Sequence, residues 1–231
     1  PPYVSYSVIN AAGELIHSTP ITIEKPVFMH DFAVTEKYSL FLDFPITLDI
    51  ERAMAGGPAL GFEPEHGSRI GVVPRFGTDS DVRWFEVETG SVVHTANAWD
   101  EGDEVVLQAS RSKTSDIANA GLGADNLQET QGQLYEWRIN LISGAVTERT
   151  LSPARCDFTR VNDGYVCHKT RFVYGAVFNP VRPFSFDGVM KFDNETQTTT
   201  TFDYGANRFG GEAVFAPKVG ATAEDDGYLI C

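Results

Sequence analysis

The stretch EWRINLISGA, residues 136–145, has the form of a β-strand that ends in a glycine turn. The stretch RWFEVETGSV, residues 83–92, has the same form, and its Gly90 lies 54 residues before Gly144. In both stretches a run of alternating apolar and polar residues precedes the glycine, and a second strand-like run follows it. Hairpins that recur at a fixed period indicate a repeat architecture.

Two further copies extend this pattern. Residues 191–201 form a third copy, which begins 54 residues after Trp137 and ends in a threonine-rich strand. Residues 8–16 form a first copy, and the Gly/Pro-rich insert at residues 54–64 accounts for its longer spacing. The period is close to the roughly 50 residues of a kelch-type propeller blade.

The repeats predict an all-β fold, a partial β-propeller that comprises about half of a closed ring. Four copies leave the ring open, and an open ring exposes sheet edges that natural proteins avoid. Residues 1–231 are therefore expected to be part of a single propeller domain, truncated at both ends. Only residues 116–130 lack strand character and are expected to form a short helix or an extended loop. The other strands are expected at residues 3–9, 27–34, 39–44, 69–73, 82–87, 92–96, 104–109, 134–139 and 166–173.

Composition excludes several classes of protein. Lys and Arg number 18 against 32 Asp and Glu, which gives a formal net charge of -14. A polyanion would be repelled by this balance, so nucleic-acid binding is not expected. The three cysteines are too few for a disulfide framework and form no CxxC pair, so a zinc ribbon is excluded as well.

The histidines are the candidates for metal chemistry. His30 lies in FMHDFAVTE, residues 28–36, an apolar strand-like run with one imidazole. From the pattern alone this imidazole is either a structural hydrogen-bonding group or a metal ligand whose partners are not evident in the chain. No HExxH and no GxSxG motif is present, which argues against a zincin site and against a serine hydrolase. His94 is expected to be structural, His17 and His66 to be solvated, and the cation of Lys169 disfavours a ligand role for His168.

Several stretches resemble one known family. MHDFAVTE, residues 29–36, is similar to a signature of the carotenoid cleavage oxygenases, which include stilbene-cleaving relatives. Other matches follow in the family's order: GVVPR (71–75), HTANAWDE (94–101), KTRFVYG (169–175), GEAVFAP (211–217) and EDDGY (224–228). The resemblance covers nearly the whole chain and implies a seven-bladed β-propeller.

The resemblance also implies an iron site. Members of the family hold Fe(II) with four histidines on the propeller axis, and His30 matches the third of them. The family's layout would put two ligands before Pro1 and one after Cys231. One imidazole does not hold iron by itself, so the segment in isolation is expected to be inactive.

Acidic residues next to the ligands are part of the same expectation. In the family they accept a hydrogen bond from the second ring nitrogen of a ligand and so fix its orientation. The matching positions here are Asp100 or Glu101, after Asn-Ala-Trp, and Asp157. Asp, with a side chain one methylene shorter, stands at two positions where the family has Glu.

The resemblance implies a non-haem iron dioxygenase that cleaves a conjugated C=C bond of a carotenoid or apocarotenoid with O2, giving two carbonyl products. Cleavage of a phenolic stilbene by the same chemistry is one alternative, and a non-catalytic propeller that serves as a binding scaffold is another. The expected partners are O2 and a hydrophobic conjugated small molecule, and membrane contact is left open. An intracellular location, in the cytoplasm or an organelle, is expected, and a targeting segment could lie outside the sequence.

Overall fold

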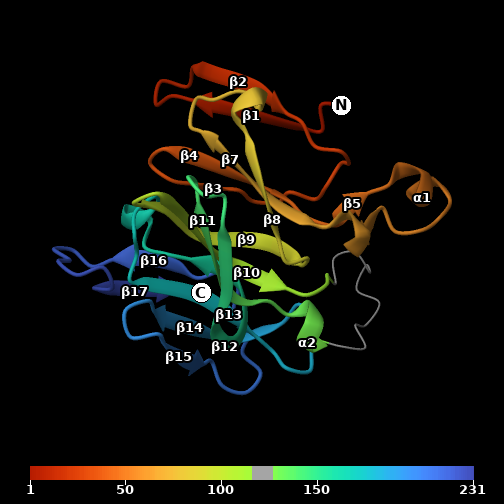
Figure 1. Ribbon diagram of the computed structural model, residues 1–231. Coiled ribbons are helices and arrows are strands. Elements are labelled where there is room, and N and C mark those ends of the chain that lie inside the picture. The colour runs from red at the N-terminus through yellow and green to blue at the C-terminus, as the bar shows by residue number, and fades with distance from the viewer. Residues whose placement is uncertain (116–126) are drawn as a thin grey trace.

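The computed structural model describes residues 1–115 and 127–231, and strands dominate it (Figure 1). The short helices are α1 (Ile50–Met54) and α2 (Leu127–Thr130), with single 3-10 turns at Pro64–His66, Asp79–Asp81 and Asp163–Tyr165. No helix in the described part of the chain is long and apolar enough to span a bilayer.

The strands form successive antiparallel groups in chain order. The first is the hairpin β1 (Val4–Ile9) and β2 (Leu15–Ile21), and the second has the order β3 (Ala33–Val34), β4 (Tyr38–Asp43), β7 (Ser68–Pro74), β8 (Arg83–Val87). A small hairpin, β5 (Ile46–Leu48) and β6 (Leu60–Phe62), branches from the second group.

A continuous seven-stranded sheet follows, with the order β15-β14-β13-β12-β11-β10-β9. Its strands are β9 (Ser91–Glu101), β10 (Glu104–Ser112), β11 (Gln133–Asn140), β12 (Val146–Arg160), β13 (Phe172–Phe178), β14 (Phe186–Asp193) and β15 (Thr198–Asp203). The hairpin β16 (Val214–Pro217) and β17 (Gly227–Ile230) ends the chain.

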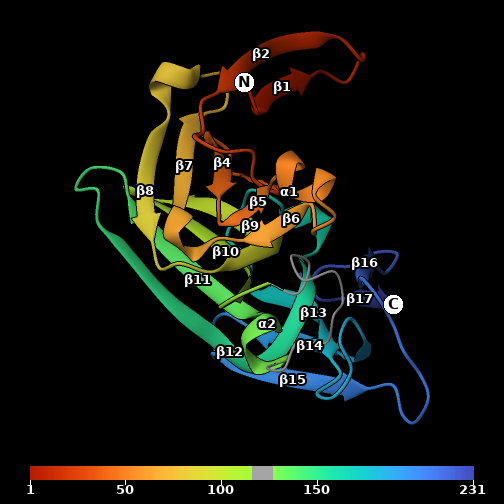
Figure 2. The same cartoon turned by 90° about the vertical axis from the view of Figure 1, so that its right-hand side faces the viewer.

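The strand β12 belongs to two groups at once. Its first part pairs with β11, from Val146 to Arg155 with a register shift after Thr150, and its last part pairs with β13, from Cys156 to Arg160. The seven-stranded sheet is therefore two four-stranded groups that share one 15-residue strand. In Figure 2 the groups follow one another as an arc, from β1–β2 at the top through β8 and β12 to β15 at the bottom. Four-stranded antiparallel groups in this arrangement are propeller blades, and the predicted all-β partial propeller is confirmed.

The core lies between neighbouring blades, where the apolar faces of successive sheets meet. Trp137, Leu107 and Ile139 are fully buried in the largest cluster, together with Leu40 and Ile70 of the preceding blade. A second cluster around Phe192 and Met190 joins the next blade. Apolar residues of alternating position on each strand account for this packing, because one face of every blade covers the face of its neighbour.

Three of the expected sequence features are corrected. Residues 27–34 contribute only the two-residue strand β3, and the stretch 166–171 is not a strand, so that β13 begins at Phe172. The copy at residues 83–92 is not a hairpin, because β8 pairs with β7 while β9 pairs with β10. Gly90 therefore lies between blades, whereas Gly144 lies in the turn of the hairpin β11–β12. Residues 116–126 of the segment 116–130 lie outside the described residues, and α2 follows them.

Candidate metal centre and adjoining cavity

Three neighbouring blades bring polar residues to the same end of their first strands. His30 and Asp31 precede β3, His94 lies near the start of β9, and Asp157 lies in the last part of β12. The rings of His30 and His94 have their centroids 4.9 Å apart and meet edge to face. His94 in turn contacts Asp157, 63 residues later in the chain. The fold thus assembles a chain of contacts that no local stretch of sequence contains.

Asp157 orients the ring of His94. The Nδ1–H of His94 donates to Oδ1 of Asp157 over 3.0 Å, since a carboxylate can only accept. Burial lowers the pKa of His94, but the hydrogen bond and charge of Asp157, with the charges of Asp31 and Glu212, outweigh it and raise the pKa above its ordinary value. Oδ1 of Asp157 also accepts from the backbone N–H of Phe158 over 2.8 Å. The imidazole is therefore held in one orientation beside His30.

Phe158 has an uncommon backbone conformation. Its φ is 52°, in the left-handed region that a bulky side chain rarely adopts and that costs about 1–3 kcal/mol. The conformation brings its ring to 4.6 Å from the ring of His94, measured between centroids. Strain of this kind persists where surrounding contacts require it, and here it places an aromatic ring against the His94–Asp157 pair.

Asp31 fastens the segment that carries His30 to the next blade. Its Oδ2 accepts from the backbone N–H of Thr95 over 2.9 Å and from the Thr95 hydroxyl over 2.7 Å. Its Oδ1 accepts from the backbone N–H of Phe32 over 2.8 Å. These three bonds use most of the acceptor capacity of the carboxylate, so Asp31 acts as a fixed support beside His30.

His30 itself is exposed and open to a ligand. It lines a cavity of about 450 Å³ together with Tyr6, Met29 and Phe32. Neither ring nitrogen forms a hydrogen bond with any residue of the described ranges, so one remains available for a metal ion. No group of three or more His, Cys, Asp or Glu side chains among residues 1–115 and 127–231 could hold a metal ion. Among the described residues, His30 is therefore a single candidate nitrogen ligand and not part of a complete metal site.

Within the described residues, Asp100 and Glu101 form no hydrogen bond with His30, and their polar contacts lie elsewhere. Oδ1 of Asp100 accepts from the Thr35 hydroxyl over 3.1 Å, whereas Asp31 bonds to Thr95. The two chain segments run side by side in the same direction. Thr95 and Asp100 are five residues apart on the same strand, so at 3.3 Å per residue the Asp31–Thr95 contact and the Thr35–Asp100 contact are about 16 Å apart. Asp100 therefore supports the far end of the strand.

Glu101 belongs to a surface ion cluster. Its carboxylate contacts Arg138 at 2.8 Å and Lys169 at 2.5 Å. Hydrogen bonds from Lys169 and Arg138 lower the pKa of Glu101 to about 2. This cluster ties the ends of β9 and β11 to the segment before β13. Asp157 is the one of the three predicted acidic residues that contacts the histidine pair.

Glu212, Asp31 and His94 were not identified from the sequence as members of this site. Glu212 precedes β16, pairs with Arg160 at 2.7 Å, and lines a cavity of about 180 Å³ together with Asp31 and His94. The only sequence signal was position, because Asp31 follows His30 directly and Glu212 lies in the GEAVFAP stretch.

Two other histidines are not solvated as expected. His66 is 6% exposed and its Nε2 lies 2.9 Å from Oδ1 of the buried Asp43. His17 is half-buried and its Nε2 lies 2.9 Å from the carbonyl oxygen of Gly77. Both fix loops to strands, because each ring bonds a group far away in the sequence.

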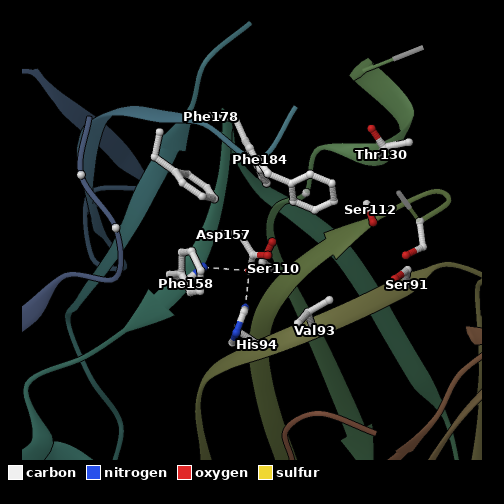
Figure 3. Close-up of a pocket in the computed structure, with 15 residues that line it drawn as sticks. Ser91, Val93, His94, Ser110, Ser112, Thr130, Asp157, Phe158, Phe178 and Phe184 are labelled. Carbon is white, nitrogen blue, oxygen red and sulfur yellow. Dashed lines mark hydrogen bonds and ion pairs between the residues drawn. The ribbon is translucent and has the colours of Figure 1, made fainter. Parts of the chain in front are cut away.

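A cavity of about 390 Å³ lies on the other side of His94 and Asp157 (Figure 3). Its lining combines aromatic and hydroxyl side chains. The lining includes Ser91, Val93, Ser110, Ser112, Thr130, Phe158, Phe178, Phe184 and Phe186. An apolar cavity with a few polar groups beside a titratable pair is the usual form of a small-molecule site.

Comparison with known proteins identifies the family. Residues 1–231 match the retinal pigment epithelial membrane protein family, and the chain belongs to this family, which includes the carotenoid cleavage oxygenases. It is 38% identical over 248 residues to the carotenoid 9,10(9',10')-cleavage dioxygenase of Crocus sativus, covering 100% of this chain and 45% of that protein. The chain thus spans about half the length of this relative.

Two other similar proteins are dioxygenases with names different from that of the first relative. The zeaxanthin 7,8(7',8')-cleavage dioxygenase, chromoplastic, of Crocus sativus is 35% identical over 241 residues, covering 99% of this chain and 64% of that protein. The 9-cis-epoxycarotenoid dioxygenase NCED1, chloroplastic, of Oryza sativa is 33% identical over 241 residues, covering 100% of this chain and 37% of that protein.

Solved structures share the fold. Lignostilbene dioxygenase of Pseudomonas brassicacearum superposes with a TM-score of 0.86 at 27% identity, over 97% of this chain and 50% of that one. Cobalt-substituted Synechocystis ACO gives a TM-score of 0.85 at 28% identity, over 97% of this chain and 48% of that one. The chain therefore has about half of the propeller of the carotenoid oxygenases, as the resemblance implied.

Proposed function

We propose that the protein containing this chain is an Fe(II)-dependent dioxygenase that cleaves a conjugated C=C bond of a carotenoid or apocarotenoid. One molecule of O2 is consumed, and each of its atoms becomes the oxygen of one of two carbonyl products. The observation that carries the proposal is the open imidazole of His30, held beside the His94–Asp157 pair and near an aromatic cavity. Relatives named as carotenoid cleavage dioxygenases support the same reaction.

The residues of this chain fit one part of an iron site. His30 supplies a nitrogen donor with no competing bond inside the described ranges, and imidazole suits ferrous iron. When bound, the iron would supply the activation of O2. A single imidazole holds it too weakly, so the other ligands are proposed to come from parts of the complete protein outside this sequence. The segment alone is accordingly proposed to be inactive.

The other residues of the site orient His30 and His94 and form the walls of the adjoining cavity. Asp31 fixes the His30 segment to Thr95, and Asp157 fixes the ring of His94 that packs against His30. Phe158 packs against His94 beside the cavity that both residues line. A conjugated hydrocarbon would bind among the aromatic side chains, where burial of its apolar surface supplies the affinity.

The structural likeness to lignostilbene dioxygenase supports a second substrate class, a phenolic stilbene cleaved by the same chemistry. A non-catalytic propeller that serves as a binding scaffold is a second alternative. Asp100 and Asp157, at positions where the family has Glu, favour this alternative. Some relatives are named chloroplastic, which favours an organelle as the location.

Iron analysis of the complete protein tests the proposal. His30→Ala is expected to remove both bound iron and turnover, because it deletes a ligand. His168→Ala is the matched control, since His168 is also exposed, with 55% of its side chain accessible, and its ring lies 3.9 Å from the carboxylate of Glu36. Iron and activity retained in His30→Ala would refute the assignment. A wild-type protein without iron would support the scaffold instead.

A further inference from the structure

One wall of the 390 Å³ cavity beside His94 and Asp157 is built from hydroxyl groups. Ser91 and Ser112 are direct partners across β9 and β10, so their side chains lie on the same face of the sheet about 5 Å apart. Ser110 lines the same cavity two residues before Ser112. Figure 3 shows Ser91 and Ser112 on neighbouring strands beside the cavity.

The hydroxyls differ in what they can offer to a ligand. Ser110 Oγ donates to the carbonyl oxygen of Cys156 over 2.7 Å, and Ser112 Oγ donates to that of Thr114 over 2.7 Å. Their protons are therefore committed, and only their lone pairs remain. Ser91 is 2% exposed, and its hydroxyl bonds no residue within the described ranges, so it can still donate. The wall offers two acceptors and one donor.

Gly132 keeps this wall in place. A Cβ atom at residue 132 would lie 2.1 Å from Ser110 Oγ and 3.1 Å from the Cys156 carbonyl oxygen. Any side chain there would displace the serine from its bond. The position of the Ser110 hydroxyl thus depends on a glycine in the neighbouring segment.

The facing wall is aromatic. The rings of Phe178 and Phe186 have centroids 4.6 Å apart, and those of Phe158 and Phe186 are 5.1 Å apart. Phe184 is half exposed at the edge of the same cavity. A ligand between the two walls would have an apolar body and a polar group on one side.

We propose that this cavity binds the hydroxyl-bearing end of the conjugated substrate and so selects hydroxylated substrates over hydrocarbons. The inference rests on the proposed function and names its substrate class. A ligand hydroxyl can donate to Ser110 or Ser112 and accept from Ser91 at once. A carbonyl can only accept and would use Ser91 alone, whereas a hydrocarbon end would leave the polar wall unpaired. A hydroxylated carotenoid ring and a phenolic stilbene share this chemistry.

Binding to the metal-free complete protein tests the inference without relying on turnover. Zeaxanthin is expected to bind roughly tenfold more tightly than β-carotene, the effect of one or two buried hydrogen bonds. Ser91→Ala and Ser112→Ala should each reduce this ratio severalfold, by weakening zeaxanthin binding and, where the lost hydroxyl was left unpaired, by tightening β-carotene binding. Ser91→Thr should restore it, and Ser143→Ala, on an exposed turn, is the control. A hydroxylated stilbene measured against stilbene distinguishes the two sources of the hydroxyl.

The outcomes separate the two proposals. Equal affinity for zeaxanthin and β-carotene together with equal affinity for the two stilbenes would overturn this inference, and so would a ratio that neither Ser91→Ala nor Ser112→Ala changes. Cleavage by the iron-loaded protein without such a preference would contradict the inference alone. A serine-dependent preference without cleavage would contradict the proposed function alone.

Discussion

Asp43 gives the sharpest test of how the blade before the site is held together. Its carboxylate is fully buried. Oδ1 lies 2.9 Å from Nε2 of His66, and Oδ2 accepts from Nε and Nη2 of Arg69, each over 2.8 Å. The three bonds fix the end of β4 to β7 and to the turn that follows the excursion through α1 and β6.

Asp43→Ala is expected to lower the free energy of unfolding by about 3 kcal/mol. Removal of one partner from a buried ion pair costs about 3–5 kcal/mol, since the other charge remains unpaired. The low end applies because the side chain of Arg69 is 31% exposed and its guanidinium stacks 4.3 Å over the ring of Trp84, so its charge stays partly compensated. Asp43→Asn keeps the size and some of the bonds and should cost about 1–2 kcal/mol.

Urea unfolding of the complete protein, followed by circular dichroism, measures both losses. Glu65→Gln is the control, because Glu65 lies in the same turn as His66 but is exposed, and a change there should stay within about 0.5 kcal/mol. Hydrogen exchange should also rise in residues 49–67, which lose their anchor. If Asp43→Ala unfolds within 1 kcal/mol of the wild type, the buried cluster does not support the blade as described.

Two further changes test the charge cluster and the core. Lowering of the Glu101 pKa from 4.5 to about 2 corresponds to at most about 3 kcal/mol, and because its side chain is 34% exposed the real contribution is about 1 kcal/mol. The contribution is present above pH 4.5 and is lost as the pH falls toward 2, so Glu101→Gln should be less stable at pH 7 and equal to the wild type near pH 2 in urea titrations. Trp137→Ala should cost about 3–5 kcal/mol by the same assay, since the ring is fully buried and its Nε1–H donates to Glu148 over 3.1 Å. A loss under 1 kcal/mol would contradict its place in the core.

The family motif and the strand composition carried most of what could be predicted. The MHDFAVTE motif marked His30 as a candidate metal ligand. Alternating apolar residues located most strands of the blades to within a few residues. The 54-residue spacing was misleading at Gly90, because a strand, a glycine and another strand look alike within a blade and between two blades. Only pairing partners tell them apart, and these are set by tertiary contacts.

The acidic residues show the same limit. Asp100 and Glu101 are close to His94 in the sequence, yet an extended strand carries them away from it at about 3.3 Å per residue. Asp157 and His94 are 63 residues apart and meet because they begin the first strands of adjacent blades. Nothing in the local pattern around either residue encodes this meeting. The hydroxyl wall was equally hidden, since serines two positions apart on a strand carry no motif.

The strand shared by two blades bears on how such a propeller can be recombined. Residues 146–160 begin as the outermost strand of one blade and end as the innermost strand of the next, with Asp157 near the second end. A chimera joined inside this strand would take the outermost strand of one blade from one parent. It would take the innermost strand of the next blade from the other parent, within one continuous strand. Residues 88–90, between two separate sheets, offer a cleaner crossover point. The unit that can be exchanged between relatives is therefore the pair of blades on either side of β12.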